Sequence, residues 1–473
     1  MRILKPWLAR LQKSAFAPVD IASIVFCRIA FGLLMTGYVW SYFSRHWIAE
    51  FWIEPRFLFK YYGFSWVHPW PGYGLYIHWA AMGLFALFIA AGFLYRVSAT
   101  LFFISYTYFF LLDQTRYQNH TYLICLFSFL LIFLPANRAL SLDAWLKPRT
   151  RSATTPAWTL WLLRAQMGIV YFCGGIAKIN PDWLHGEPMR MLMAHGTNFP
   201  IIGRFFREEW AVYMMSYGAL LFDLLIVPLL LWRRTRVAAF CATILFHLSN
   251  ARLFTIGVFP WFAIAATTLF LSSDWPRRVV SIFRSDSAPA SAADARTPTS
   301  GRNQFAVVSL VTMYLAVQIL LPISPFLFPG GSEWIYMQHR FSWRMMLRYQ
   351  STHGYFYVTD PNTDSTYRVN PLQFLTPSQG ARIYWQPDMV LQFAHYLATV
   401  MPRAGPKPLK VEARIFVSIN GRPPELFVDP NVDLATESRT LMRPRWLLQA
   451  HEPLPPRGKD FSEDPFRSQS NPE

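Results

Sequence analysis

Three groups of polar side chains interrupt long apolar stretches of this chain, and they are its strongest candidates for chemistry. The groups comprise Asn119 and His120 in QNHTY, Lys178 in YFCGGIAKINPDW, and His247, Asn250 and Arg252 in FHLSNARLF. A neutral amine can remove a proton from a substrate, and imidazole and amide groups can bind and orient polar atoms. Ionisable residues are costly in apolar surroundings, so their presence there indicates a function.

Each candidate also has an ordinary structural explanation. A lysine at a helix end can complement the helix dipole and extend its amine to the interface. His120 can be an interfacial histidine and His247 a hydrogen-bonded packing residue. His247 and Asn250 are three residues apart and would share a helix face. Asn180 and Pro181 are typical of the cap and first residue of a short surface helix, which would fix where the chain turns after the lysine.

The composition places most of the chain in a membrane. Hydrophobic residues make up 53% and aromatic residues 17% of the 473 positions, far from an ordinary soluble domain. A bilayer crossing needs about 20 predominantly apolar residues, and roughly nine segments qualify: 19–41, 75–94, 98–112, 120–135, 158–177, 211–232, 237–254, 257–272 and 304–326. The sequence therefore predicts a mainly α integral membrane bundle. The basic N-terminus precedes an apolar stretch too long for a cleavable signal, so the first span should remain as an anchor.

The distribution of Lys and Arg predicts the orientation, because cytoplasmic loops carry an excess of both. With the N-terminus in the cytoplasm, the inner connections contain Arg96, Arg138, Lys147, Arg149, Arg151, Arg233, Arg234, Arg236, Arg277, Arg278 and Arg284. This inner collar facing anionic lipid explains part of the formal charge of +17, so the charge is weak support for nucleic-acid binding. The C-terminal third then lies outside the plasma or inner membrane. All three polar groups also face outward, where they can converge on one site.

The chain divides into three predicted parts. Residues 1–327 form the transmembrane bundle, in which 285–303 is a flexible cytoplasmic linker because it is small, polar and interrupted by proline. Residues 328–449 form a β-rich extracytoplasmic domain, where KVEARIFVSINGRPPELFVDP alternates and then turns at Asn420 and Gly421. Residues 450–473 bury too little apolar surface to order themselves and form a disordered tail.

Other conspicuous residues predict structure rather than chemistry. The four cysteines all fall in predicted spans, and neither they nor the histidines show the spacing of a metal site. Trp183 is typical of an aromatic belt at the membrane interface, although it also lies beside the candidate lysine. At about 1.5 Å per helical residue, Arg28, Arg164 and Asp223 should share a depth near the inner side. We expect them to form a buried ion-pair cluster that holds the bundle.

Several long motifs, in order and spacing, resemble the membrane domain of vitamin K-dependent gamma-glutamyl carboxylase and its bacterial relatives, the HTTM proteins. They are DIASIVFCRIAFGLLM, YFFLLDQTRYQNHTYL, LLRAQMGIVYFCGGIAKINPDWLHGEPM, FHLSNARLFTIGVFPW and SSDWPRR. FSWRMM, PDMVLQFAHYLA and SINGRPPELFVDPNVDL look like the family's exposed C-terminal region. The resemblance covers residues 18–446.

The resemblance implies a lyase-type carboxylase that uses a quinol, O2 and CO2 to convert a protein glutamate to gamma-carboxyglutamate while the quinol becomes an epoxide. It implies that Lys178 deprotonates the hydroquinone and that His120, preceded by Asn119, serves the carboxylation half of the reaction. His247 matches the family's histidine in FHxMN, with Asn250 retained. Reduced vitamin K or a related quinol is the implied cofactor, and a glutamyl peptide or protein is the implied partner. Arg252 and Trp183 are the remaining candidate site residues.

This reaction explains why such residues are needed. A hydrogen beside a carboxylate is too weakly acidic for any side chain to remove, so a stronger base must be made on a cofactor and shielded from water. To deprotonate the quinol, the lysine must be neutral. A lysine in water has a pKa of about 10.4 and is charged at neutral pH, but burial can lower the pKa of a lysine. A lipid-soluble quinone reaches the site laterally from the bilayer.

The chain departs from the family in its C-terminal region, which is shorter. The animal enzymes carry a disulfide between the first exterior loop and this region, and this chain has no cysteine in either place. The docking of the exposed domain is therefore open. Two other functions also remain open. One is a related quinol oxygenase or epoxidase with a different acceptor or none, and the other is a non-enzymatic membrane scaffold or transporter. Transport is disfavoured because neither a repeat nor paired broken helices are detectable.

Overall fold

The computed structural model describes residues 10, 12–194, 199, 202–254, 256–283, 301–327, 334, 339–451, 453 and 454. Most of the predicted linker 285–303 lies outside these residues, and its last positions belong to a helix that begins at Gly301. The predicted tail 450–473 also lies outside them, apart from 450, 451, 453 and 454. Residues 328–333, at the predicted domain boundary, are likewise outside the described part.

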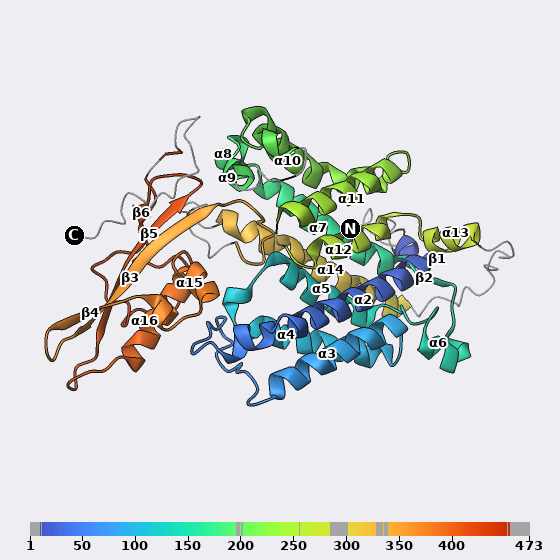
Figure 1. Cartoon of the computed structure of the whole chain (residues 1–473). Coiled ribbons are helices and arrows are strands. Elements are labelled where there is room, and N and C mark those ends of the chain that lie inside the picture. Colours follow the sequence, from blue (N-terminus) through green and yellow to red (C-terminus); the bar gives the residue numbers. More distant parts are fainter. Residues whose placement is uncertain are drawn as a thin grey trace, which may run out of the picture.

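A bundle of helices forms the larger part of the molecule (Figure 1). Each predicted span overlaps one helix of this bundle: α2 (Ala22–Ser44), α3 (Gly74–Ala91), α4 (Tyr95–Leu112), α5 (Asn119–Phe133), α7 (Ala157–Ala177), α10 (Glu209–Leu231), α11 (Arg236–Leu253), α12 (Phe259–Thr267) and α14 (Gly301–Ile323). Within the described residues, six helices are long and apolar enough to cross a membrane, namely α2, α3, α4, α7, α10 and α14. Helix α5 and the stretch Phe259–Phe270 are apolar but shorter. The chain is a multi-pass membrane protein, and the predicted count of nine crossings is not confirmed.

Short elements connect these helices. They are strands β1 (Pro18–Asp20) and β2 (Thr154–Pro156), helices α6 (Leu142–Leu146), α8 (Pro181–Leu184), α9 (Met189–Ala194) and α13 (Trp275–Ile282), and the single turns Ala49–Ile53, Gln114–Arg116, Pro148–Thr150, Gly203–Phe205, Thr268–Phe270, Ser324–Leu327 and Pro371–Gln373. Strands β1 and β2 pair antiparallel just before α2 and α7. This pairing holds the starts of the two helices side by side.

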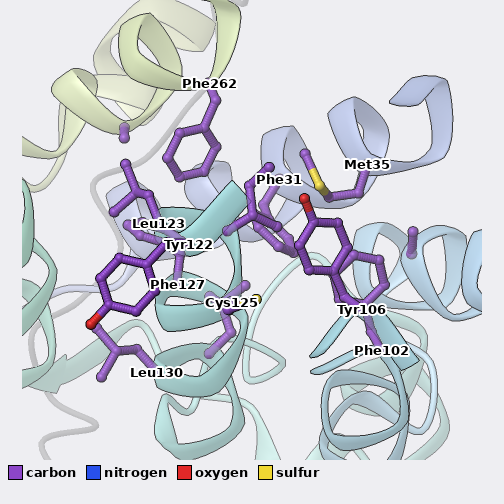
Figure 2. Packing of buried hydrophobic residues seen from close by; sticks show 14 of the residues in the cluster. Phe31, Met35, Phe102, Tyr106, Tyr122, Leu123, Cys125, Phe127, Leu130 and Phe262 are labelled. Carbon is purple, nitrogen blue, oxygen red and sulfur yellow. The ribbon is translucent and has the colours of Figure 1, made fainter. Parts of the chain in front are cut away.

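The core of the bundle lies where α2, α4, α5 and α12 meet, and Figure 2 shows its side chains around Phe31. The ring of Phe31 lies 5.6 Å from that of Phe102 and 6.0 Å from that of Phe127, measured between centroids. Close backbone packing adds to these contacts, since a Cβ at Gly32 would lie 2.5 Å from the backbone nitrogen of Ala90. Helices in lipid associate through such close packing, because apolar burial alone gains little there.

The C-terminal domain contains a four-stranded antiparallel sheet, as the predicted β-rich region requires, together with two helices. Its strands are β3 (Gln350–Asp360), β4 (Ser365–Val369), β5 (Lys410–Ile419) and β6 (Glu425–Leu426), in the spatial order β4-β3-β5-β6. Phe356 of β3 pairs in register with Ala413 of β5, and both side chains are fully buried. Helices α15 (Pro377–Ile383) and α16 (Pro387–Val400) cover this buried face (Figure 1).

The predicted turn after β5 is confirmed. Asn420 and Gly421 have φ angles of 53° and 78°, and the amide of Arg422 donates to the carbonyl of Ile419 at 3.1 Å. Glycine adopts this left-handed region freely, and asparagine tolerates it better than most residues. Pairing with β6 resumes only at Glu425, so the loop is longer than a two-residue hairpin.

The C-terminal domain docks on the connection between α2 and α3, without a disulfide. Phe59 of this connection is fully buried in the core of the C-terminal domain. The backbone of Lys60 exchanges two hydrogen bonds with the side-chain amide of Gln392, at 2.8 and 3.1 Å. Arg439 donates to the carbonyl of Lys60 at 2.8 Å and pairs with Asp388 at 2.7 Å. All four cysteines of the chain are free, so these contacts take the place of a crosslink.

Candidate active site

Lys178 follows the last residue of α7 and is buried, with 5% of its surface exposed. Its Nζ lies 2.6 Å from Oδ2 of Asp223 on α10 and donates to the carbonyl of Gly174 at 3.2 Å. The amine also faces the ring of Trp183, with 5.1 Å to the ring centroid. A buried amine with a carboxylate in contact can exchange a proton with it, which is the property required of a base.

Two glycines let the carboxylate reach the lysine. A Cβ at Gly174 would lie 3.4 Å from Oδ2 of Asp223, and a Cβ at Gly175 would lie 2.7 Å from the side chain of Leu224 and 3.1 Å from its backbone nitrogen. Small residues allow two helix backbones to approach closely. The pair GG in YFCGGIAK is therefore explained by the contact between α7 and α10 at this level.

The predicted ion-pair cluster of Arg28, Arg164 and Asp223 is wrong, because Asp223 pairs with Lys178 at the C-terminal end of α7. The prediction estimated the depth of each of these residues in the membrane by counting from the end of its predicted span. However, the first turns of α10 extend beyond the end of α7 and pack on α8 and α9 (Figure 1). There the indole of Trp183, on α8, donates to the carbonyl of Ser216, on α10, at 2.9 Å. Asp223, well inside α10, therefore lies level with the last turn of α7.

The two arginines instead bind backbone carbonyls where neighbouring helices end. Arg28 donates to the carbonyl of Ala136, just after α5, at 2.9 Å. Arg164 donates to the carbonyls of Leu269 and Leu271, after α12, at 2.7 and 3.0 Å. Each guanidinium therefore pairs with main-chain acceptors in the chain that follows a neighbouring helix. Their expected structural role thus rests on hydrogen bonds to the backbone.

The short helix α8 holds Trp183 against the lysine. The Asn180 side chain caps α8 by accepting from the amide of Trp183 at 2.9 Å and donates to the carbonyl of Ala177 at 2.8 Å. The Trp183 indole donates to the carbonyl of Ser216 at 2.9 Å. Trp183 is almost fully buried, so it is a packing and cation-contacting residue and not part of an interfacial belt.

Asp182, on the same helix, joins this region to the C-terminal domain. Its carboxylate accepts hydrogen bonds from Arg422 at 2.7 and 2.9 Å and from the amide of Asn420 at 2.8 Å. Burial alone would raise the pKa of Asp182, but the hydrogen bonds from Arg422 and Asn420 outweigh burial and hold the pKa below its usual value. The contact is therefore a stable ion pair at neutral pH.

His247 lies in a second buried cluster, with Tyr171. Nε2 of His247 and the Tyr171 hydroxyl are 2.7 Å apart, and this hydroxyl lies 3.3 Å from that of Thr267. Tyr171 is seven residues before Lys178, which places it on the same face of α7 at a distance of about 10 Å along the axis. The Phe259 ring lies 5.7 Å from the His247 ring and 6.0 Å from that of His120. The two histidines thus flank one aromatic ring.

Asn119 lies at the start of α5 and contacts the C-terminal domain. Its amide donates to the carbonyl of Arg344 at 3.2 Å, and its oxygen accepts from the Tyr117 hydroxyl at 3.1 Å. His120 is half-buried next to it, and a Cβ at Gly257 would lie 4.0 Å from its Nε2. Asn119 therefore anchors a segment of the C-terminal domain, while His120 faces α12.

The segment 341–347 enters the bundle beside the Lys178 pair. Trp343 is buried in the bundle core and stacks on Tyr122 of α5, with 5.2 Å between ring centroids. A Cβ at Gly174 would lie 3.3 Å from the Met345 side chain and 3.8 Å from the carbonyl of Trp343. Trp183 and this segment therefore cover the lysine and its carboxylate.

The structure does not bring all six polar candidates together in one cluster; they are Asn119, His120, Lys178, His247, Asn250 and Arg252. Asn250 is half-buried, Arg252 is exposed on the last turn of α11, and neither joins another side chain through a hydrogen bond or ion pair among the described residues. Within the same residues, no group of three or more His, Cys, Asp or Glu side chains could hold a metal ion. The site consists of the Lys178 pair and the two histidines around Phe259.

Sequence reasoning missed Tyr171, Asp182 and Arg422, and it misplaced Asp223. Tyr171 carries a local signal, because its spacing from Lys178 puts both on one helix face. Asp182 and Arg422 are 240 residues apart, and only the fold shows that they meet.

Comparison with known families gives two matches. The HTTM domain matches residues 16–275, which include all helices from α2 to α12 and more than half of the chain. The lumenal domain of vitamin K-dependent gamma-carboxylase matches residues 303–453, which begin within α14 and include the C-terminal sheet. No solved structure matches the chain. Both matches agree with the motifs found in the sequence, and the chain belongs to the vitamin K-dependent gamma-carboxylase family.

Proposed function

We propose that this protein carboxylates glutamyl residues of a peptide or protein and couples this reaction to the epoxidation of a quinol by O2. The observation that carries the proposal is the buried pair of Lys178 and Asp223 at the C-terminal end of α7. A buried ion pair contributes little net stability compared with apolar residues of the same size, so its presence favours a chemical role. The two family matches support the same reaction class.

The residues around His247 fit a bound quinol such as reduced vitamin K. Nδ1 of His247 is buried without a hydrogen-bond partner among the described residues, and a buried polar atom is costly unless something pairs with it. The rings of Phe222, Phe246 and Phe259 lie 6.3, 5.4 and 5.7 Å from the imidazole. These flat apolar side chains suit a quinol ring, and an oxygen of the quinol would pair with Nδ1.

Lys178 and Asp223 can hold the proton that the reaction must move. Transfer from Nζ to Oδ2 across 2.6 Å makes both groups neutral, and neutral groups cost less to bury than charges. Neutral Nζ can then accept the proton of a quinol hydroxyl, which leaves a cation beside the resulting anion. The bound quinol supplies, through its reaction with O2, a base strong enough to remove the hydrogen beside a glutamyl carboxylate. Trp183 and the segment 341–347 keep water from the pair.

The decisive experiment incubates the purified protein in lipid with reduced vitamin K, labelled bicarbonate and a glutamate peptide. We expect label in the peptide and epoxide in equal amounts. Epoxide without label would indicate the related quinol oxygenase with a different acceptor or none. Neither product would leave the non-enzymatic scaffold as the better explanation.

His120→Ala is expected to lose more carboxylation than epoxidation. His120 contacts the Phe259 ring, as His247 does, and makes no hydrogen bond to Lys178 or Asp223 among the described residues, so proton removal from the quinol should continue without it. The ratio of labelled peptide to epoxide measures the effect. His68→Ala, at an exposed exterior position, should leave the ratio unchanged. An equal loss of both products in His120→Ala would place His120 with the base instead.

We also propose that the C-terminal domain lies outside the cytoplasm and the N-terminus inside. The positive-inside distribution supports this orientation, and so does the lumenal domain that matches residues 303–453. A reporter fused after Gln449 should be active only outside the cytoplasm, whereas one fused after Thr150 should be active only inside. The reverse pattern would overturn the shared outer position of the polar groups.

A further inference from the structure

We infer that the C-terminal domain positions Lys178 for proton transfer through the ion pair between Asp182 and Arg422. The inference rests on the proposed function, because it takes Lys178 as the base. It assigns Asp182, Arg422 and Asn420 as positioning residues, which act on the reaction through the lysine and touch no substrate themselves.

The helix that contains Asp182 is tied directly to the lysine. Three residues separate Lys178 from Asp182, and the Asn180 side chain bonds to both ends of this stretch, at the Ala177 carbonyl and the Trp183 amide. The Trp183 ring meets the Lys178 amine from the same helix. A displacement of Asp182 therefore moves the residues that hold Nζ against Asp223.

On the other side, the partners of Asp182 belong to the rigid end of the sheet. The backbone of Asn420 donates to the carbonyl of Tyr349 at 2.8 Å, and its side-chain oxygen accepts from the Tyr349 amide at 2.8 Å. Asn420 and Arg422 lie in the turn after β5, in which Asn420 and Gly421 have positive φ angles. Leu347, next to β3, also packs in one cluster with Ala177 and Trp183.

This contact is not needed to keep the C-terminal domain attached. The domain docks separately on the connection between α2 and α3, through Phe59 and through Arg439, which pairs with Asp388 of its own domain and donates to the carbonyl of Lys60. The side chains of Arg439 and Asp388 are 21% and 17% exposed, and those of Arg422 and Asp182 are 19% and 6% exposed. The two ion pairs are therefore comparable in burial, but only the pair of Asp182 and Arg422 lies beside Lys178.

Arg422→Gln tests the inference, with Arg439→Gln as its matched control. Both changes remove one guanidinium from a bidentate contact. The first readout is the rate at which a small amine-reactive reagent labels Lys178, measured by mass spectrometry on the full protein in lipid. We expect labelling at least about tenfold faster in Arg422→Gln than in Arg439→Gln, because a charge-assisted hydrogen bond holding the lysine helix is lost.

The second readout is the rate of quinol epoxidation. We expect kcat to fall about 10- to 100-fold in Arg422→Gln, since small displacements of a reacting group have effects of this size. The KM for quinol should stay unchanged, because the residues around His247 are not altered. Arg422→Lys keeps one charged donor and should recover part of kcat, and it replaces Arg422→Gln in both assays if the latter does not fold.

The outcomes separate this inference from the proposed function. A wild-type protein that forms no epoxide would refute the function, while the labelling rates would still decide whether the ion pair holds Lys178. Equal labelling and equal kcat in Arg422→Gln and Arg439→Gln would overturn the positioning role, whatever the activity of the wild type.

Discussion

Quinol epoxidation and glutamyl carboxylation should both be abolished by replacing Lys178. Removal of a general base typically lowers a rate by about 10²- to 10⁴-fold, and in the proposed reaction both products depend on the same first proton transfer. Lys178→Met preserves most of the side-chain volume below Trp183. The measurement is epoxide and labelled peptide from the same reaction, with protein that remains monodisperse in detergent.

A single substitution at Lys178 also leaves Asp223 buried without its partner, so loss of activity needs a stability control. Lys178→Met with Asp223→Leu removes both charged groups together and should fold at least as well as the single variant, because a buried pair can be replaced by apolar residues. It should remain inactive. In Lys178→Ala, a small added amine should restore part of both activities. Wild-type epoxidation by the double variant would return Lys178 to the role of a helix-end anchor.

Asp223→Ala is expected to cause the largest loss of stability. It leaves the Lys178 amine buried without a counter-ion, and breaking a buried pair in this way costs about 3–5 kcal/mol of unfolding free energy. Asp223→Asn should lose less, because its oxygen can still accept a hydrogen bond from Nζ. Unfolding in detergent, followed by circular dichroism, measures both changes.

The control for Asp223→Ala is Asp274→Ala. Asp274 pairs with Arg278 at 2.7 Å, but both side chains are substantially exposed, and such pairs contribute about 0–1 kcal/mol. Equal unfolding free energies for the Asp223 and Asp274 variants would mean that the Lys178 pair is not energetically buried. The proton-sharing role of Asp223 would then lose its physical basis.

The parts of the fold that the sequence predicted are those set by local pattern. Every predicted span overlaps a helix, because a backbone in lipid must satisfy its own hydrogen bonds. The turn at Asn420 and Gly421 followed from the φ angles that these residue types tolerate. The number of crossings did not follow, because α5 and the stretch Phe259–Phe270 are apolar but short.

The candidate site was predicted in its residues and not in its contacts. Lys178 was identified from its place in an apolar run, but its partner depends on how far α10 extends past α7. The contact of Asp182 with Arg422 depends on a domain that follows far along the chain. Such long-range geometry leaves no periodic signal in either segment.

The burial of Phe59 also constrains how the molecule assembles during synthesis. The C-terminal sheet and its helices do not form a complete hydrophobic core by themselves, because the fully buried Phe59 comes from the connection between α2 and α3. That connection leaves the ribosome long before β3 does, so it is already outside the translation machinery when the sheet is made. The early segment is therefore available to complete the core when the late one folds, and separating the two would expose apolar surface of the kind that promotes aggregation.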